Sequence, residues 1–148
     1  MRLWRISNYP DLKGIGGTKK KGRWHNPGAP IVYLSENPAL AMLEVMVHFE
    51  LDQHEFPENY QLLEIEYTHR KGVSHLSSGL LGDGWQHEQD MTRAYGDEWL
   101  VGGSTLLLRV PSAILPHSYN YLFNPKHVLA GEAKIVAVSK HPFDKRLT

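Results

Sequence analysis

A carboxylate and an imidazole lie four residues apart in a segment that is otherwise apolar. Between residues 39 and 49, only Glu44 and His48 carry polar side chains. In a helix, residues i and i+4 lie about 40° apart around the axis, so this pair would form one narrow polar stripe. The stripe can simply face solvent. Alternatively, Glu44 lines a cleft and supplies a negative charge to the chemistry there.

A glycine-flanked loop concentrates four permanent cations around one aromatic residue. From Lys19 to His25 its sequence is Lys-Lys-Lys-Gly-Arg-Trp-His. Such a loop can bind phosphate through backbone amides and the Arg23 guanidinium, or nucleic acid through its cations and base stacking on Trp24. It can also be an ordinary solvated loop, and the sequence leaves all three interpretations open.

Familiar nucleotide and metal motifs are absent. The segment from Gly14 to Lys19 does not complete G-x-G-x-x-G, and the segment from Gly17 to Arg23 reads G-x-x-x-x-G-R, which excludes Rossmann and P-loop sites. Glu44 and His48 do not form H-E-x-x-H, and the nine histidines show no ligand spacing, so we expect no metal.

Ser112, Asn120 and Asn124 each have a structural and a functional interpretation. No G-x-S-x-G elbow surrounds Ser112, so it is not expected to be a hydrolase nucleophile; its hydroxyl either caps a helix starting at Ala113 or binds substrate. Asn120 and Asn124 either stabilise turns or hydrogen-bond a ligand amide. For Asn124, the following Pro125 favours a turn.

These residues must be positioned by a mixture of strands and helices. Asn37 as N-cap and Pro38 at the first helical position predict a helix continuing to His48, with its apolar sides buried in the core. Residues 14–22 and 77–84 read as loops. Without β-α-β regularity, the pattern indicates an α+β fold. The other predicted elements are strands over 3–6, 31–34, 60–67, 105–110 and 135–138 and a short helix over 96–101.

Length and composition limit the functional classes. The 148 residues are predicted to form a single domain, and 16 basic residues balance 16 acidic ones. A neutral chain lacks the field that gathers nucleic acid or anionic lipid, so neither is an expected partner. There is no cysteine, which excludes disulfides and thiolate chemistry. No signal sequence or long apolar run occurs, so we expect a cytoplasmic protein.

The ordered set of motifs resembles the RES domain of bacterial RES–Xre toxin–antitoxin systems. The blocks are Gly22-Arg23-Trp24-His25-Asn26-Pro27-Gly28-Ala29-Pro30-Ile31-Val32-Tyr33, Ala39 to Glu44, Gly96 to Leu100, Leu108 to Ala113, Asn120 to His127 and Pro142 to Leu147. Together they extend over practically the whole chain. The family is similar in fold to diphtheria-toxin-type ADP-ribosyltransferases.

The resemblance implies a toxin that consumes NAD by cleaving its nicotinamide N-glycosidic bond. It implies Arg23, Tyr33 and Glu44 as catalytic residues, with Arg23, Tyr33, Ser112 and Asn120 contacting substrate. NAD is then the substrate, and no cofactor is implied. An Arg fork for phosphate, an aromatic face and a carboxylate beside an oxocarbenium-like charge fit this reaction. His25 and His48 receive no role, and neither does the region from residue 53 to 95.

Partners and rival functions follow from the same comparison. The resemblance implies an Xre-type DNA-binding antitoxin and leaves room for a higher-order toxin–antitoxin complex. The ribosyl acceptor can be water, phosphate or a protein side chain. One rival is an RNA-binding or ribonuclease toxin that uses the basic loop; another is a noncatalytic binding domain in which Arg23 and Glu44 form a structural ion pair.

Overall fold

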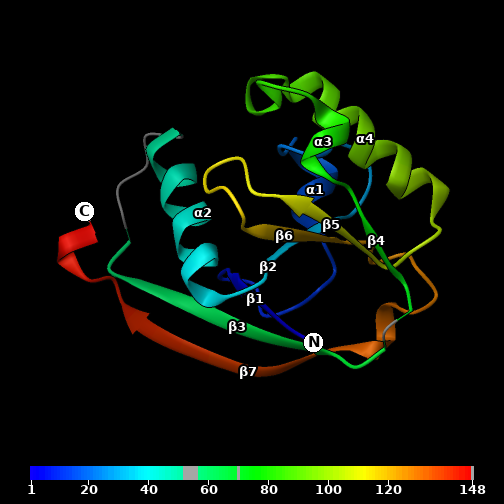
Figure 1. Cartoon of the computed structure of the whole chain (residues 1–148). Helices are drawn as coiled ribbons and strands as arrows, with labels where there is room; N and C mark the ends of the chain where they lie inside the picture. Colours follow the sequence, from blue (N-terminus) through cyan, green and yellow to red (C-terminus); the bar gives the residue numbers. More distant parts are fainter. Residues whose placement is uncertain (52–56, 70, 148) are drawn as a thin grey trace.

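Seven strands form one mixed sheet in the order β4-β5-β6-β2-β1-β3-β7 (Figure 1). The computed structural model describes residues 1–51, 57–69 and 71–147. All neighbouring strands pair antiparallel except β4 and β5, which are parallel. The strands are β1 (Arg2–Ile6), β2 (Val32–Ser35), β3 (Asn59–Tyr67), β4 (Val73–His75), β5 (Leu107–Pro111), β6 (Tyr119–Phe123) and β7 (Ala133–Pro142).

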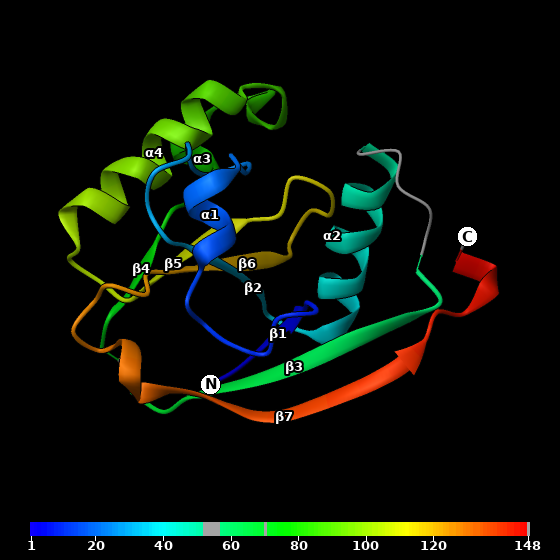
Figure 2. The same cartoon turned by 180° about the vertical axis from the view of Figure 1, so that it is seen from behind.

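The helices gather over two separate parts of the sheet. Figure 2 shows α1, α3 and α4 beside β4, β5 and β6, while α2 stands apart from them over β1 and β3. Four are α-helices: α1 (Ile15–Lys19), α2 (Pro38–Leu51), α3 (Ser78–Leu81) and α4 (Gln89–Gly102). Three are short 3₁₀ turns: η1 (Trp85–His87), η2 (Ala130–Glu132) and η3 (Lys145–Leu147). This mixed architecture confirms the predicted α+β fold.

The sheet divides into two halves where β1 meets β2. Only one pair, Trp4 with Ser35, is in register there, whereas β3 and β7 pair along nine residues. One buried cluster takes side chains from both halves and forms the core between them: Leu3, Val32, Leu34, Leu63, Ile65, Tyr67, Leu106, Leu107, Phe123 and Ala133. A second cluster lies beneath α3, η1 and α4: Trp24, Ile31, Leu81, Trp85, Trp99, Leu108, Val110 and Leu122.

Helix α2 starts as predicted but is less buried than predicted. The Asn37 side chain accepts a hydrogen bond from the Leu40 amide at 2.8 Å, which is an N-cap contact. Among the α2 residues whose side chains the structure describes, only Leu40 and Ala41 are buried, and the side chains from Met42 to Val47 are half-buried. The expected core burial is therefore wrong, because α2 packs on β1 and β2 along one side alone. Phe49 was expected in the core with the other apolar residues of this helix, but its side chain lies outside the described part of the structure.

Several elements differ from the sequence predictions. The segment 14–22 contains the short helix α1, and the predicted loop around 77–84 contains α3. Helix α4 starts at Gln89, two turns before the predicted helix, and β7 is more than twice the predicted length. Strands β4 and β6 were not predicted. Residues 53–56 and 70, within the region left without a role, lie outside the described residues.

Candidate active site

One face of β2 and β6 supplies the polar side chains of the candidate site. Val32 and Leu34 point into the core between the sheet halves, so Tyr33 and Ser35 point to the other face. Ser35 lies opposite Asn120 of β6, which in turn lies opposite Val110 of β5. Ser112 directly follows β5. The sheet register therefore brings Ser35, Asn120 and Ser112 together although they are far apart in sequence.

Helix α2 places Glu44 against this group. Glu44 Oε1 accepts hydrogen bonds from Ser112 Oγ at 2.9 Å and from Asn120 Nδ2 at 2.7 Å. Asn120 Oδ1 accepts a hydrogen bond from Ser35 Oγ at 2.8 Å, which fixes the orientation of its amide. Among the described residues, no hydrogen bond reaches Oε2. The polar stripe of α2 thus meets the sheet at Glu44 rather than facing solvent, while His48 is exposed.

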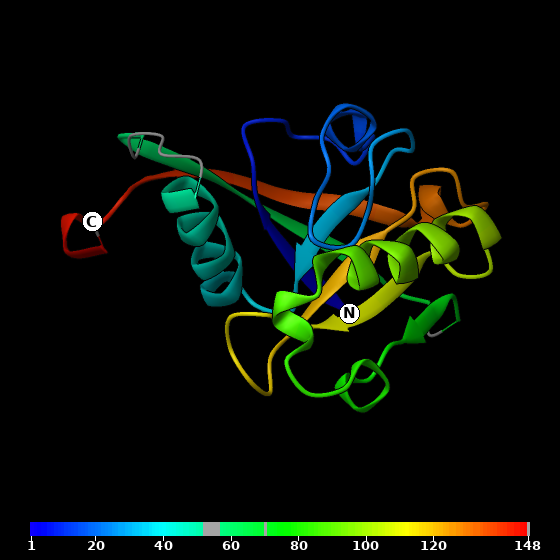
Figure 3. The ribbon, with the colours of Figure 1, turned by 90° about the horizontal axis from the view of Figure 1, so that it is seen from above.

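Ser112 holds the backbone of the loop that follows it and contacts Glu44 at the same time. Its hydroxyl oxygen accepts hydrogen bonds from the amides of Ile114 and Leu115 at 3.1 and 3.2 Å while it donates to Glu44. No helix follows it, because residues 113–118 form an irregular connection to β6. The predicted helix cap is therefore wrong, and the hydroxyl caps a loop instead. Figure 3 shows this connection between α2 and the helices on the other half.

Arg23 lies in the turn between α1 and β2 and is half-buried. Its Nη1 donates to the Gln86 carbonyl at 2.9 Å, which directs the side chain along η1. Burial lowers the pKa of Arg23, while the negative charge of Glu44 acts in the opposite direction and the positive charge of Arg93 acts with burial. The guanidinium and the Glu44 carboxylate are thus close enough for their charges to interact.

Tyr33 is hydrogen-bonded within the protein. Its hydroxyl oxygen accepts from the Trp24 amide at 3.1 Å and lies 2.6 Å from His25 Nδ1. Burial raises the pKa of the Tyr33 phenol above its usual range. Adding a Cβ at Gly22 would place it 2.4 Å from the phenol oxygen, so only glycine allows this close approach.

Two residues of α4 that the sequence reasoning missed hold the Arg23 turn. Thr92 Oγ1 donates to the Arg23 carbonyl at 2.5 Å, and Arg93 Nε donates to the Gly22 carbonyl at 2.8 Å. Arg93 also donates to Gln89 Oε1 at 2.7 Å. The hydrogen bonds to the Arg23 and Gly22 carbonyls join segments about 70 residues apart, whereas the one to Gln89 is local. No local pattern signals them, since their acceptors are backbone carbonyls of a distant turn.

The lysines and the tryptophan ring of the basic loop do not belong to the candidate site. Lys19, Lys20 and Lys21 are exposed, and Trp24 is buried, with its ring 5.8 Å from that of Trp85. The expectation that Trp24 could stack on a nucleic-acid base is therefore wrong, because a core tryptophan offers no free face. Within the described chain, no ion pair joins Arg23 to Glu44, so the predicted structural ion pair is also wrong.

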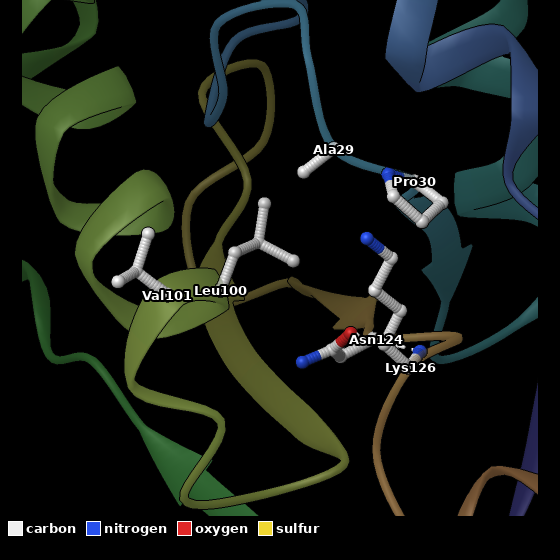
Figure 4. Close-up of a pocket in the computed structure, with 6 residues that line it drawn as sticks. All are labelled: Ala29, Pro30, Leu100, Val101, Asn124 and Lys126. Atoms are coloured by element: carbon white, nitrogen blue, oxygen red, sulfur yellow. Dashed lines mark hydrogen bonds between the residues drawn. The ribbon is translucent and has the colours of Figure 1, made fainter.

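Arg23, Tyr33 and Glu44 do not line the pocket of about 190 Å³ near the end of α4 (Figure 4). That pocket is lined by Ala29, Pro30, Leu100, Val101, Asn124 and Lys126. Asn124, which accepts the Lys126 amide at 3.0 Å, forms the predicted turn there. Within the part of the chain that the structure describes, no group of three or more His, Asp or Glu side chains could hold a metal ion.

The arrangement combines three chemical capacities. A half-buried guanidinium can bind an anion such as a phosphate, and the Tyr33 ring offers an aromatic surface. A carboxylate oriented by two neutral donors can stabilise positive charge that develops during a reaction. A substrate with an anionic group and a centre that becomes cationic on bond cleavage would fit all three.

Comparisons with known proteins agree on one family. The family model described as "RES domain" matches residues 2–145. The curated protein "Toxin Res" of Pseudomonas putida strain KT2440 is 48% identical over 147 residues, covering 99% of both chains. "Prs ADP-ribosylating toxin" of Sphingobium sp. strain YBL2 is 36% identical, covering 98% of this chain and 95% of the relative.

A solved structure shows the same fold. A chain of the M. tuberculosis MbcT–MbcA toxin–antitoxin complex superposes with a TM-score of 0.74 at 18% identity, covering 95% of this chain and 84% of that chain. Among the described residues, no helix is long and apolar enough to cross a bilayer.

Proposed function

The chain belongs to the RES domain family, and on that premise we propose that it is the toxin of a toxin–antitoxin system and that it cleaves NAD. The proposed reaction breaks the N-glycosidic bond between nicotinamide and ribose. Arg23, Tyr33 and Glu44 contact the substrate and act on the reacting atoms, and Ser112 and Asn120 orient the carboxylate and the ribose.

The observation that carries this proposal is the environment of Glu44. Its carboxylate is held by Ser112 and Asn120, two neutral donors, rather than by a cation in direct contact. It therefore keeps its negative charge available to a ligand. Arg23 stands within range of that charge and offers donors for an anion. Such a pair of opposite charges suits a dinucleotide with a diphosphate at one position and a cationic leaving group at another.

The bond cleavage needs little acid catalysis. The electron pair of the C1′–N bond leaves with nicotinamide, whose ring loses its positive charge, and the ribose becomes oxocarbenium-like. Glu44 stabilises this positive charge, and the Tyr33 ring packs beside a flat group of the substrate. A nucleophile then adds at C1′ and loses a proton to solvent. Neither step uses a metal ion, so chelators are expected to leave the activity unchanged.

The nucleophile defines two versions of the activity. Water or inorganic phosphate would give free ADP-ribose or its phosphate ester. A protein side chain would give an ADP-ribosylated target, and the similarity to a relative named "Prs ADP-ribosylating toxin" favours testing this second version. Both versions release nicotinamide from the same bond.

We also assign an antitoxin as partner, since a chain of similar fold is known from a toxin–antitoxin complex. By the family resemblance, the antitoxin is of the Xre type with a DNA-binding domain. An enzyme that consumes NAD inside its own cell must be blocked, and covering the Arg23–Glu44 group is the most direct way. A carboxylate of the antitoxin beside Arg23 would occupy the position of a substrate phosphate.

The test is an assay of the purified chain, free of antitoxin, with NAD and with RNA. Nicotinamide release is followed by chromatography, with and without chelator. NAD labelled in its adenylate distinguishes free ADP-ribose from labelled protein when cell extract is added. Intact NAD over hours in the presence of folded protein contradicts the proposal, and cleavage of RNA under the same conditions supports the ribonuclease alternative.

A further inference from the structure

His25 is a buried histidine that the proposed reaction does not use. The residue is only 2% exposed, and both ring nitrogens have partners. Nε2 lies 2.9 Å from the Lys20 carbonyl and 3.1 Å from the Gly17 carbonyl, and Nδ1 lies 2.6 Å from the Tyr33 hydroxyl. The ring thus connects α1 to the aromatic residue of the candidate site.

These contacts determine where the ring carries its proton. Carbonyl oxygens only accept hydrogen bonds, so Nε2 must be the protonated nitrogen that donates to Gly17 and Lys20. Burial, the largest influence, lowers the pKa of His25, although the two carbonyls and Asp97 act in the opposite direction and Arg93 acts with burial. The ring is therefore neutral at pH 7, and Nδ1 carries a lone pair.

The lone pair on Nδ1 then determines the direction of the Tyr33 hydroxyl. The phenol donates its proton to Nδ1 while its oxygen accepts from the Trp24 amide. Its only proton is used within the protein. A ligand can meet the Tyr33 ring or the remaining lone pair of the oxygen, but it cannot receive this proton.

His25 also closes the turn that carries Arg23. Its backbone carbonyl accepts from the Gly22 amide at 3.1 Å, so residues 22 and 25 form an isolated β-bridge on either side of Arg23 and Trp24. Arg93 holds the other side of Gly22 through its carbonyl. The histidine side chain and backbone thus act on both Tyr33 and Arg23.

We propose that His25 is a positioning residue: as the neutral Nε2–H tautomer its ring fixes the Tyr33 hydroxyl, while its backbone carbonyl closes the Arg23 turn, so that the substrate meets the tyrosine ring and not its proton. The part of this inference that concerns substrate binding rests on the proposed function, because it takes Arg23 and Tyr33 as substrate contacts. The part that concerns the tautomer rests on the hydrogen bonds and on the burial of the ring, and it does not depend on the substrate.

The first experiment measures the tautomer directly. Protein labelled with ¹⁵N and ¹³C is examined by long-range ¹H–¹⁵N correlation at pH 7, with the His25 ring signal assigned through bonds from its own backbone, so that no variant is needed. We expect a neutral ring protonated at Nε2. A ring protonated at Nδ1, or on both nitrogens, overturns the proposal.

Two variants then separate the contacts of the two ring nitrogens. An asparagine amide oxygen lies near the position of Nδ1 and can still accept from Tyr33, whereas a glutamine amide reaches the position of Nε2 and keeps only the contacts with Gly17 and Lys20. We expect His25→Asn to bind ADP-ribose within about threefold of the parent and His25→Gln to bind at least tenfold more weakly. Equal affinities of Asn, Gln and parent proteins overturn the positioning role.

Calorimetry with ADP-ribose measures affinity without turnover, and circular dichroism confirms that each variant is folded. If both variants fail to fold, the tautomer measurement still decides whether His25 holds Tyr33. A parent protein that neither cleaves NAD nor binds ADP-ribose overturns the proposed function, and with it the part of the inference that concerns substrate binding. A parent that does both, with a His25 ring protonated at Nδ1 or on both nitrogens, overturns only the inference about His25.

Discussion

Glu44 receives its hydrogen bonds from neutral groups, and this is the main chemical feature of the site at the scale of single residues. An ion pair would reduce the field that the carboxylate exerts on a ligand, whereas a hydroxyl and an amide orient it and leave its net charge intact. Both bonds converge on Oε1. A ligand in the site can therefore approach Oε2 without displacing either donor.

Replacing Glu44 and Arg23 should separate turnover from binding. Glu44→Gln keeps an oxygen for Ser112 and Asn120 but removes the charge, so we expect kcat to fall about 100-fold with a small change in KM. If Arg23 binds the diphosphate as proposed, Arg23→Ala removes this charge-assisted contact, and we expect KM to rise about 10- to 100-fold. Steady-state kinetics of NAD cleavage measure both. Unchanged kcat in Glu44→Gln would contradict the electrostatic role of the carboxylate.

His25 should make stability depend on pH in a defined direction. Burial lowers its pKa in the folded protein, so below the ordinary value of about 6.5 the unfolded chain binds more protons at this residue. Its contribution to stability is complete above that value and is lost as the pH falls. We expect the free energy of unfolding to decrease more between pH 7 and pH 5 in the parent than in His25→Asn. Urea unfolding at both pH values measures this difference; an equal decrease would mean that His25 titrates normally.

Some residues of the candidate site were predictable from sequence and others were not. Arg23, Tyr33, Glu44, Ser112 and Asn120 were identified because they occur in recognisable blocks, and the structure brings Glu44, Ser112 and Asn120 into direct contact. Thr92 and Arg93 were missed, because their contribution consists of hydrogen bonds to backbone carbonyls of a distant turn. Such contacts exist only once α4 is packed, and no residue spacing encodes them.

At the scale of elements, the predicted strands and α2 were found where apolar periodicity and an N-cap defined them. Helix α1 was missed because two of its five residues are glycine and Gly14 precedes it at φ 68°, so its sequence favours a turn. The first turns of α4 were missed because they are polar. In the whole helix only Thr92, Gly96 and Trp99 are buried. Strand β6 was missed because its polar and apolar residues do not alternate clearly. Three of its five residues are only half-buried.

Gly96 determines how closely α4 approaches the Arg23 turn. A Cβ at this position would lie 1.6 Å from the Trp24 carbonyl oxygen, which cannot move without displacing the turn. We expect Gly96→Ala to destabilise the protein by at least about 3 kcal/mol and to abolish NAD cleavage. Gly102 in the same helix has no atom within 4 Å of the added Cβ, so Gly102→Ala is the matched control and should change stability by less than about 1 kcal/mol. Equal melting temperatures of the two variants would contradict this packing argument.

At the scale of the whole molecule, the site depends on contacts between segments distant in sequence. Arg23 precedes β2, Glu44 lies on α2, Ser112 follows β5 and Asn120 lies on β6. The register of β2, β6 and β5 brings Asn120 and Ser112 beside Ser35. Helices α2 and α4 lie over different parts of the sheet, as Figure 2 shows. An inhibitor that covers these residues therefore meets several segments of the chain.

Direct occupation of the site by the antitoxin can be distinguished from blocking by bulk. If an antitoxin carboxylate lies beside Arg23, reversing the charge with Arg23→Glu should weaken the complex by about 2–5 kcal/mol, since a desolvated attractive pair becomes repulsive, and should also reduce NAD turnover. Lys140 is an exposed cation on β7, and Lys140→Glu makes the same charge change outside the proposed site. Its affinity should match that of the parent. Titration of the antitoxin by calorimetry at two salt concentrations separates a local contact from a long-range charge effect, and equal affinities of parent and Arg23→Glu would show that the antitoxin does not occupy the phosphate position.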